Sequence, residues 1–421
     1  MTTPSFSRLG SSNAYDITRS NLLARQTNLA NLQDQMTSGK RVVVASDDPT
    51  SAAQAERSLT RITRIAADLR ALESQRSAIS TAEGALGEAS EALQTIRERV
   101  FASGNAAYST EQRKSIAFEL SGLRNQLFEI ANRKDASGLP IFGGLGSALA
   151  PFTGPTAPPQ DYTFNGLPGQ TANSDVGIPL ALDGDSGFMH KAARDGVYNV
   201  KVSNTVTGTI PSDRTLTTTS VSLTNSSLVN GSAYSINVTG VSTTAGITTV
   251  TYGVTETPNV GGPYTGLTVS YPSTQTGIIP VTVMPGIALT ITGTPAVGDT
   301  IKVDPSASIF SVLDNAIKDI GGAVNGNDVT QAVGQALNNI DIGMARISAI
   351  RGQAGDFLNR ADRISSNQGK RSIDLEADRS RVEDLDMIKG ISEFQKQQTG
   401  YQAALQTYAQ VQKLSLFNFI S

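Results

Sequence analysis

Apolar residues recur at alternating steps of three and four along the first 130 residues, and this spacing constrains the fold more than any other feature. Such a narrow stripe is typical of a coiled-coil seam, because a globular helix carries a broader apolar face. Three successive stretches carry the stripe: Tyr15, Leu22, Leu29, Leu32 and Met36; then Ile62, Ile65, Leu69, Leu72, Ile79, Leu86, Leu93, Ile96 and Val100; then Ile116, Leu120, Leu123, Leu127 and Ile130. We therefore expect three helices, the second running from about Pro49 to Val100 and the third capped by Ser109 or Thr110.

Helical periodicity returns from about Ile309 to the last residues of the chain. One stripe contains Val333, Leu337, Ile340, Met344, Ile347 and Leu358, and a second contains Ile391, Phe394, Tyr401, Leu405 and Tyr408. An apolar cluster follows, made of Leu414, Leu416, Phe417, Phe419 and Ile420. Because the N-terminal and C-terminal seams match, we expect these helices to pair.

The middle of the chain has a different composition. Residues 201–300 contain 25 threonines but only five charged residues. Segments such as "SAYSINVTGV" and "GITTVTYGV" alternate β-branched residues between Gly, Pro, Asn and Asp turns, which indicates antiparallel strands. The predicted fold class is α+β: long N- and C-terminal helices form an antiparallel coiled-coil bundle, and an all-β outer domain, either a sandwich or barrel-like, is inserted between them. The expected parts are residues 1–45 (N-terminal inner helix and linker), 46–148 (coiled-coil helices), 149–308 (Thr/Ser-rich β domain), 309–383 (coiled-coil helices) and 384–421 (C-terminal inner helix).

The stretch "MTSGKRVVVASDDPTSAAQAE", residues 36–56, contains the motif that most resembles a chemical site. A phosphate-binding loop would need an upstream glycine separated from Gly39 by four residues and a hydroxyl residue in place of Arg41, and both are absent. Two adjacent carboxylates, Asp47 and Asp48, make a poor cation site by themselves. The structural interpretation is better: Gly39 ends one helix, Asp48 caps the next, and Pro49 occupies its first position.

The remaining chemistry-bearing residues are few. The chain has no cysteine and one histidine, His190, for which we expect a solvent-facing or hydrogen-bonded loop position. "DGDSGF" at 183–188 begins like a calcium loop, but Arg194 stands where a bidentate Glu is needed, so a turn is favoured. No pair of carboxylates stands out for general acid–base work. We expect no enzyme activity, no catalytic residues, no cofactor and no metal site.

Charge and hydropathy limit the partners. A net charge of -3 and a pI near 5.4 argue against nucleic-acid binding. No stretch approaches the roughly twenty apolar residues of a membrane span. The N-terminus lacks a basic start followed by an apolar core, so we expect no cleaved signal peptide and no membrane insertion.

Two terminal segments resemble a known family. "LANLQDQMTSGKRVVVASDDPTSAAQA" is similar to the N-terminal signature of the flagellins and related flagellar axial proteins. The segment "EDLDMIKGISEFQKQQTGYQAALQTYAQVQKLSLFNFIS" resembles more specifically the members that join hook to filament. "ASGLPIFGG" and "GTPAVGDTIKV" are shorter similarities, whereas most of residues 200–285 shows none.

The resemblance implies a structural subunit of the flagellum, located extracellularly at the hook–filament junction after type III export in the unfolded state. It implies self-association into a ring, contacts with the neighbouring hook-associated junction protein and with flagellin, and an export chaperone at the C-terminal helix. The assembly residues that it implies are Leu22, Leu29, Leu32, Met36, Lys40, Arg41, Asp47, Asp48, Pro49, Ile391, Phe394, Tyr401, Leu405, Tyr408, Leu414, Leu416, Phe417, Phe419 and Ile420. Each apolar stripe could equally be an intramolecular core.

Two alternatives stay open at this point. The chain could be a flagellin that forms the filament itself, although "DDPTSAAQA" and "LSLFNFIS" differ from the segments usual in flagellins. It could also be a flagellin-like surface protein that binds carbohydrate, with Tyr234, Tyr252, Tyr264 and Tyr271 stacking on sugars.

Overall fold

The computed structural model describes residues 6–155, 161–172, 174–258 and 261–420, and side chains from residue 16 to residue 410 within those ranges. The chain divides into two compact units: one contains residues 1–70 and 365–421, and the other contains residues 71–364. Two long helices, α2 (Pro49–Ser103) and α7 (Gly326–Glu383), contribute to both units.

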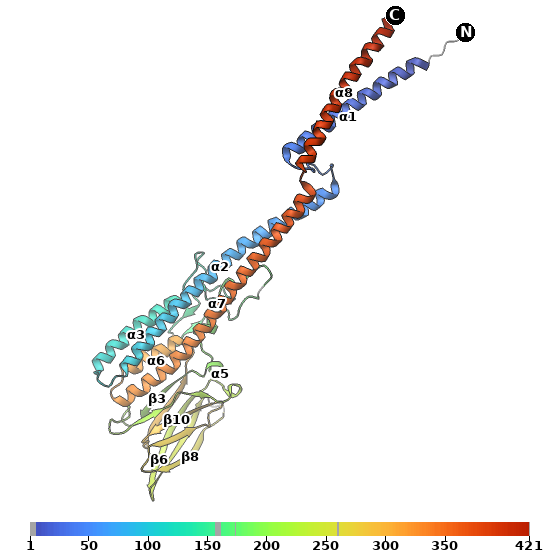
Figure 1. The fold of residues 1–421 in the computed structure, drawn as a ribbon. Helices are drawn as coiled ribbons and strands as arrows, with labels where there is room; N and C mark the ends of the chain where they lie inside the picture. The colour runs from blue at the N-terminus through green and yellow to red at the C-terminus, as the bar shows by residue number, and fades with distance from the viewer. Residues whose placement is uncertain (1–5, 156–160, 173, 259–260, 421) are drawn as a thin grey trace. The chain divides into compact units, whose positions relative to one another are not determined.

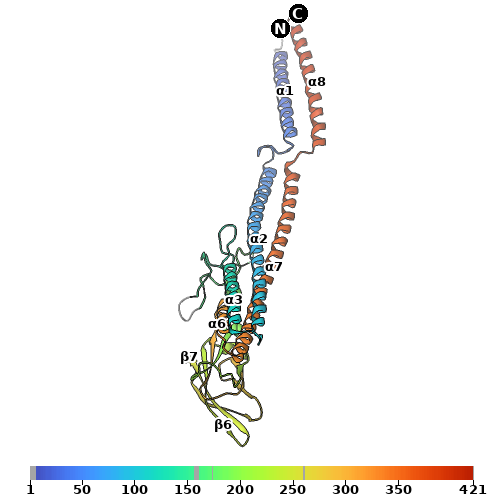
Figure 2. The same ribbon diagram turned by 90° about the vertical axis from the view of Figure 1, so that its left-hand side faces the viewer.

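The first unit contains only helices and short links. Helix α1 (Phe6–Ser38) lies beside α8 (Met387–Ile420), as Figures 1 and 2 both show. The two helices run antiparallel, because Gly39 near the end of α1 accepts a hydrogen bond from the amide of Leu385 just before α8. The predicted pairing of the terminal helices is therefore confirmed.

The helical part of the second unit is an antiparallel bundle. Helices α2 and α7 are joined by ion pairs at successive levels, among them Arg97–Asp341 at 2.6 Å and Arg351–Glu83 at 2.7 Å. The seam between the helices buries Ile79, Leu86, Leu93, Ile96 and Val100 completely or almost completely. Helices α3 (Thr110–Ala131) and α6 (Ile309–Gly321) pack against each other beside them. Ser109 caps α3 in a reciprocal arrangement with Gln112, as the sequence predicts.

The inserted domain is an antiparallel sandwich. The larger sheet has the order β3 (Tyr198–Asn204), β11 (Asp299–Pro305), β6 (Ala233–Thr244), β7 (Ile247–Thr257) and β8 (Tyr264–Pro272). In the smaller sheet β10 (Ile287–Gly293) pairs with β4 (Leu216–Thr218), β5 (Ser222–Leu223) and β9 (Gly277–Val281). Inward-facing residues of both sheets form one apolar core, which includes Ile236, Val250, Ile291 and Ile301. No closed barrel forms in the described part of the chain, so the sandwich is the correct alternative.

The expectation of β structure throughout residues 149–308 is wrong for its first third. Between α3 and β3 the only strands among the described residues are the two-residue pair β1 (Phe152–Thr153) and β2 (Thr163–Phe164). The short helices α4 (Gly184–Phe188) and α5 (Ala192–Asp195) follow, and the 3-10 turn η1 (Ser226–Leu228) lies between β5 and β6. An aromatic cluster replaces the sheet as the organising core, with Phe152, Phe188 and Phe310 in mutual contact.

One face of α7 attaches the sandwich to the helices through side-chain amides. Asn327 accepts from the amide of Leu216 and donates to its carbonyl, at 2.8 and 2.9 Å. One turn later Gln331 accepts from the amide of Thr218 at 2.8 Å and donates to the carbonyl of Val200. Gln335 and Asn339 continue the series to the carbonyls of Thr219 and Tyr198. Residues spaced by four share one helix face, so α7 satisfies backbone groups on the edges of both sheets.

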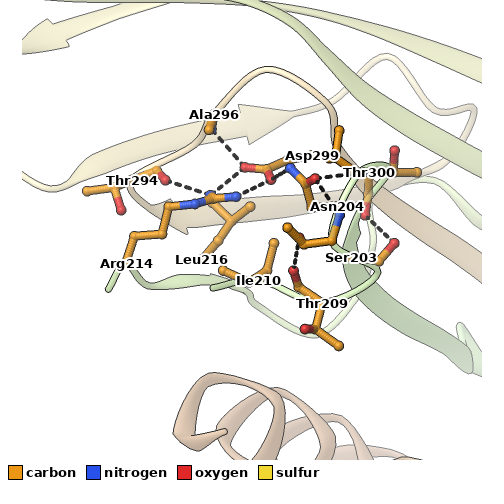
Figure 3. Close-up of polar contacts among 12 residues, drawn as sticks. Ser203, Asn204, Thr209, Ile210, Arg214, Leu216, Thr294, Ala296, Asp299 and Thr300 are labelled. Carbon is orange, nitrogen blue, oxygen red and sulfur yellow. Dashed lines mark hydrogen bonds and ion pairs between the residues drawn. The ribbon is translucent and has the colours of Figure 1, made fainter. Parts of the chain in front are cut away.

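A buried ion pair between Arg214, just before β4, and Asp299, at the start of β11, joins the two sheets (Figure 3). The carboxylate of Asp299, which is fully buried, accepts from both terminal nitrogens of Arg214. It also accepts from the Asn204 side chain at 2.8 Å and from the Ala296 amide at 2.7 Å. Each carboxylate oxygen of Asp299 thus accepts from the guanidinium and from an amide, so the buried charge is fully hydrogen-bonded. The pair links the residues just before β4 to the start of β11.

Candidate assembly surface

The link between α1 and α2 follows the structural interpretation of the sequence. Gly39 has a positive φ of 70°, a backbone conformation that glycine adopts without strain, and it ends α1. Asp48 precedes Pro49 and caps α2: its carboxylate accepts from the Ser51 amide at 3.1 Å and from the Ser51 hydroxyl at 2.6 Å. These hydrogen bonds, chiefly from Ser51 and then from Thr50, hold the pKa of Asp48 well below its usual range.

The charged residues of the link contact the same chain. Lys40 forms an ion pair with Glu383 at the end of α7. Arg41 donates to the carbonyl of Val382 at 2.7 Å and pairs with Asp48, while its own amide donates to the carbonyl of Glu383 at 2.7 Å. These contacts attach the link to the last turn of α7, a partner segment that the sequence analysis did not identify. No apolar periodicity in the sequence indicates that the last turn of α7 contacts the link.

Asp47 stabilises the link from within. One of its carboxylate oxygens accepts from the amides of Val43 and Val44, both at 3.0 Å. As a result the link turns Val43 and Val44 outward, with 44% and 54% of their surface exposed, whereas Val42 is buried. The link therefore presents two apolar side chains to solvent beside its exposed polar ones.

The predicted residues of α1 and α8 pack against one another incompletely. Seven of them are half-buried: Leu22, Leu29, Leu32, Met36, Phe394, Tyr401 and Tyr408. Ile391 and Leu405 stay 43% and 42% exposed, and on α1 the neighbouring Leu23 stays 54% exposed. Two paired helices cannot bury an apolar stripe as a full bundle does, so these helices retain apolar surface.

The C-terminal cluster of Leu414, Leu416, Phe417, Phe419 and Ile420 lies in the backbone of α8, but its side chains lie outside the described residues. One close approach between the two helices is described: a side chain at Gly400 would come within 2.8 Å of the Arg25 guanidinium. Glycine at this position therefore lets Arg25 lie against α8.

The residues considered for chemistry have structural roles. Asp183 caps the short helix α4 by accepting from the amide of Asp185 at 3.1 Å, and Asp185 pairs with Lys191 at 2.8 Å. "DGDSGF" is therefore not the expected turn but the capped short helix α4, and its carboxylates are used in capping and ion pairing. Within the described residues there is no group of three His, Asp or Glu side chains placed to hold a metal ion. Nor is any helix there long and apolar enough to cross a membrane.

His190 contradicts its expectation. It is buried, with 6% of its surface exposed, and neither ring nitrogen has a hydrogen-bond partner among the described residues. Burial lowers its pKa to about 4, Asp195 opposes that effect, and Arg194 and Arg346 add to it. The sequence could not show this, because the burial comes from chain segments far apart in sequence.

The tyrosines of the carbohydrate-binding alternative belong to the sandwich core. Tyr234 and Tyr252 are buried, with 3% and 5% of their surfaces exposed, and Tyr264 and Tyr271 pack against the same core. The first two have no ring face available for stacking on a sugar.

Paired terminal helices, an antiparallel helix bundle and a β sandwich inserted between them in the sequence define the class of this protein as a coiled-coil protein with an inserted β domain. The model of the bacterial flagellin N-terminal helical region matches residues 11–146, and that of the C-terminal helical region matches residues 337–420. Together these matches cover more than half of the chain. The chain belongs to the bacterial flagellin family.

Individual relatives differ in how much they share. The chain is 33% identical to flagellar hook-associated protein 3 of Salmonella typhimurium over 153 residues, which are 34% of this chain and 46% of that protein. It is 22% identical to flagellin of the same organism over 478 aligned positions, covering 94% of this chain and 96% of the relative. The solved flagellar junction protein FlgL of Legionella pneumophila has a similar fold, with a TM-score of 0.56 and 24% identity over 73% of this chain and 98% of that one.

Proposed function

We propose that the protein is a structural subunit of the bacterial flagellum that joins the hook to the filament. The observation that carries the proposal is the surface of α1 and α8, where apolar residues at heptad spacing remain half-exposed in the protomer. Exposed apolar stripes on paired helices favour further helix packing, which a polymer subunit obtains from its neighbours. The resemblance to hook-associated protein 3 supports the junction over other positions in the flagellum.

In this proposal assembly is coupled to folding. A single helix that carries a narrow seam cannot bury it alone, so residues 1–45 and 384–421 become ordered when subunits associate. The coiled-coil parts 46–148 and 309–383 then carry the outer part 149–308. The chain is exported unfolded without a cleaved signal, after a chaperone binds the C-terminal helix, and it forms a ring outside the cell. The ring contacts the neighbouring hook-associated protein and flagellin.

A deletion strain tests the junction. We expect hooks without filaments and flagellin released into the medium. Normal filaments in that strain would refute the proposal. Removal of residues 411–421 should leave the sandwich folded, measured by circular dichroism of the purified chain, while abolishing assembly.

Flagellin remains the second candidate, because the similarity to it extends over nearly the whole chain. Immunogold labelling separates the two. Label confined to the base of the filament supports the junction, and label along the filament supports the flagellin.

A further inference from the structure

We propose that the link between α1 and α2 forms a groove that receives the first turn of α8 from a second copy of this chain. The inference rests on the proposed function, since it assigns one subunit contact within the assembly. The link groove has a volume of about 490 Å³. Its lining combines apolar residues, among them Val43, Val44 and Leu59, and small residues of α2 with four charged residues: Lys40, Glu56, Arg379 and Glu383.

Three of the four charged residues in the lining, Lys40, Arg379 and Glu383, are already paired with one another. Lys40 and Arg379 both form ion pairs with Glu383, and Arg41 pairs with Asp48. Val43, Val44 and Leu59 keep 44%, 54% and 40% of their surfaces exposed. An apolar side chain entering this groove would displace water from three hydrophobic residues without separating an existing ion pair.

The chain carries a suitable apolar residue at the start of α8. Ile388 is 85% exposed, and Met387 beside it is 43% exposed. The carboxylate of Asp386 accepts from the amides of Ile388 and Lys389, both at 3.1 Å, so this turn is held in one conformation. Little conformational entropy is then lost when Ile388 binds a partner.

Charge complementarity favours a second copy as the occupant. Glu56 lines the link groove, and Lys389 adjoins Ile388. Neither charge forms an ion pair within the part of the chain that the structure describes. An isoleucine followed by a cation therefore matches an apolar groove that contains an anion.

The groove and the first turn of α8 are two different surfaces of the same compact unit, and they adjoin: the amide of Leu385, just before α8, donates to the carbonyl of Gly39 at the start of the link. Two different surfaces that bind each other generate a ring or a helical array, as opposed to a closed dimer. Each subunit would thus use its groove toward one neighbour and its Ile388 toward the other.

Disulfide crosslinking tests the contact directly, because the chain has no cysteine of its own. Full-length Val44→Cys and Ile388→Cys proteins are co-expressed in a strain that lacks the native gene, and isolated flagella are oxidised. We expect a covalent dimer on non-reducing gels. The matched control pairs Val44→Cys with Ile373→Cys, since Ile373 is 71% exposed in the same unit, on α7, but does not line the groove. Absence of a dimer above that control, or a dimer from Val44→Cys alone, would overturn the contact.

A second pair of variants keeps the test decisive if cysteine proteins assemble poorly. Ile388→Asp should reduce the number of filaments at least about tenfold, the loss expected when about 1.4 kcal/mol of contact energy is removed. Ile373→Asp should leave filament number unchanged, and an equal effect of both changes would refute the contact. If the deletion strain lacks filaments but the crosslink is absent, only this contact is wrong. If that strain has normal filaments, the junction function itself is wrong.

Discussion

The buried His190 predicts a specific loss of stability in mild acid. Its pKa is about 4 in the folded chain and about 6.5 when exposed, because burial disfavours the imidazolium. The unfolded chain therefore binds a proton at a higher pH than the folded chain does. His190 therefore leaves the free energy of unfolding unreduced above about pH 6.5, and this free energy decreases as the pH falls from 6.5 toward 4. A depression of this size corresponds to roughly 3 kcal/mol at 1.36 kcal/mol per pKa unit.

The single histidine makes the measurement unambiguous. NMR of histidine-labelled protein reports one imidazole, whose titration should lie near pH 4. Urea denaturation of the chain and of His190→Leu, from pH 7 to pH 4, should give a difference that grows in favour of the leucine variant as the pH falls. The leucine removes the unpaired ring nitrogens, so its stability at pH 7 should be at least equal. A measured pKa within one unit of 6.5, or a difference independent of pH, would refute the reasoning.

Three substitutions test the remaining contacts by chemical denaturation followed by circular dichroism. Arg214→Ala leaves the fully buried carboxylate of Asp299 without its cation and should lower the free energy of unfolding by roughly 3–5 kcal/mol. The control Arg381→Ala breaks an exposed pair with Asp378 and should lower it by at most about 0.5 kcal/mol. Equal losses would contradict the role of burial. Gln331→Ala removes the side-chain partner of the Thr218 amide and the Val200 carbonyl and should lower the free energy of unfolding by about 1–3 kcal/mol. The control Gln353→Ala, at an exposed position of the same helix, should lower it by about 0.5 kcal/mol or less. Gly39→Ala meets no neighbouring atom, so its cost should be only the backbone strain of a positive φ, about 1–2 kcal/mol. Because the proposed function orders the link on assembly, this variant is measured by denaturing isolated flagella, and an unchanged stability would mean that the link adopts another conformation.

Local patterns predicted the helices and most strands well. The heptad stripes, the Ser109 cap and the Gly39–Asp48–Pro49 link all form as expected, since each depends on residues within a few positions of one another. The quoted segments "SAYSINVTGV" and "GITTVTYGV" correspond to β6 and β7. Residues 149–197 were misassigned because their order comes from an aromatic cluster, and contacts between distant phenylalanines leave no periodic signal.

The candidate site was predicted only in part. The spacing of Leu22, Leu29 and Leu32 showed which face of α1 is apolar, but not how much of it α8 leaves exposed. Lys40, Arg41 and Asp47 were expected to contact other subunits, and the structure adds that each also bonds to groups of its own protomer. The assembly roles of the predicted residues remain predictions.

The sequence alone therefore determined the periodic elements, the capped link between the first two helices and the family to which the chain belongs. These features depend on side-chain spacing and local backbone preference, both of which act over a few residues. Tertiary structure decided the amide ladder of α7 and the burial of Asp299 and His190. Each of these depends on groups more than one hundred residues apart, or on solvent exclusion, which no local pattern encodes.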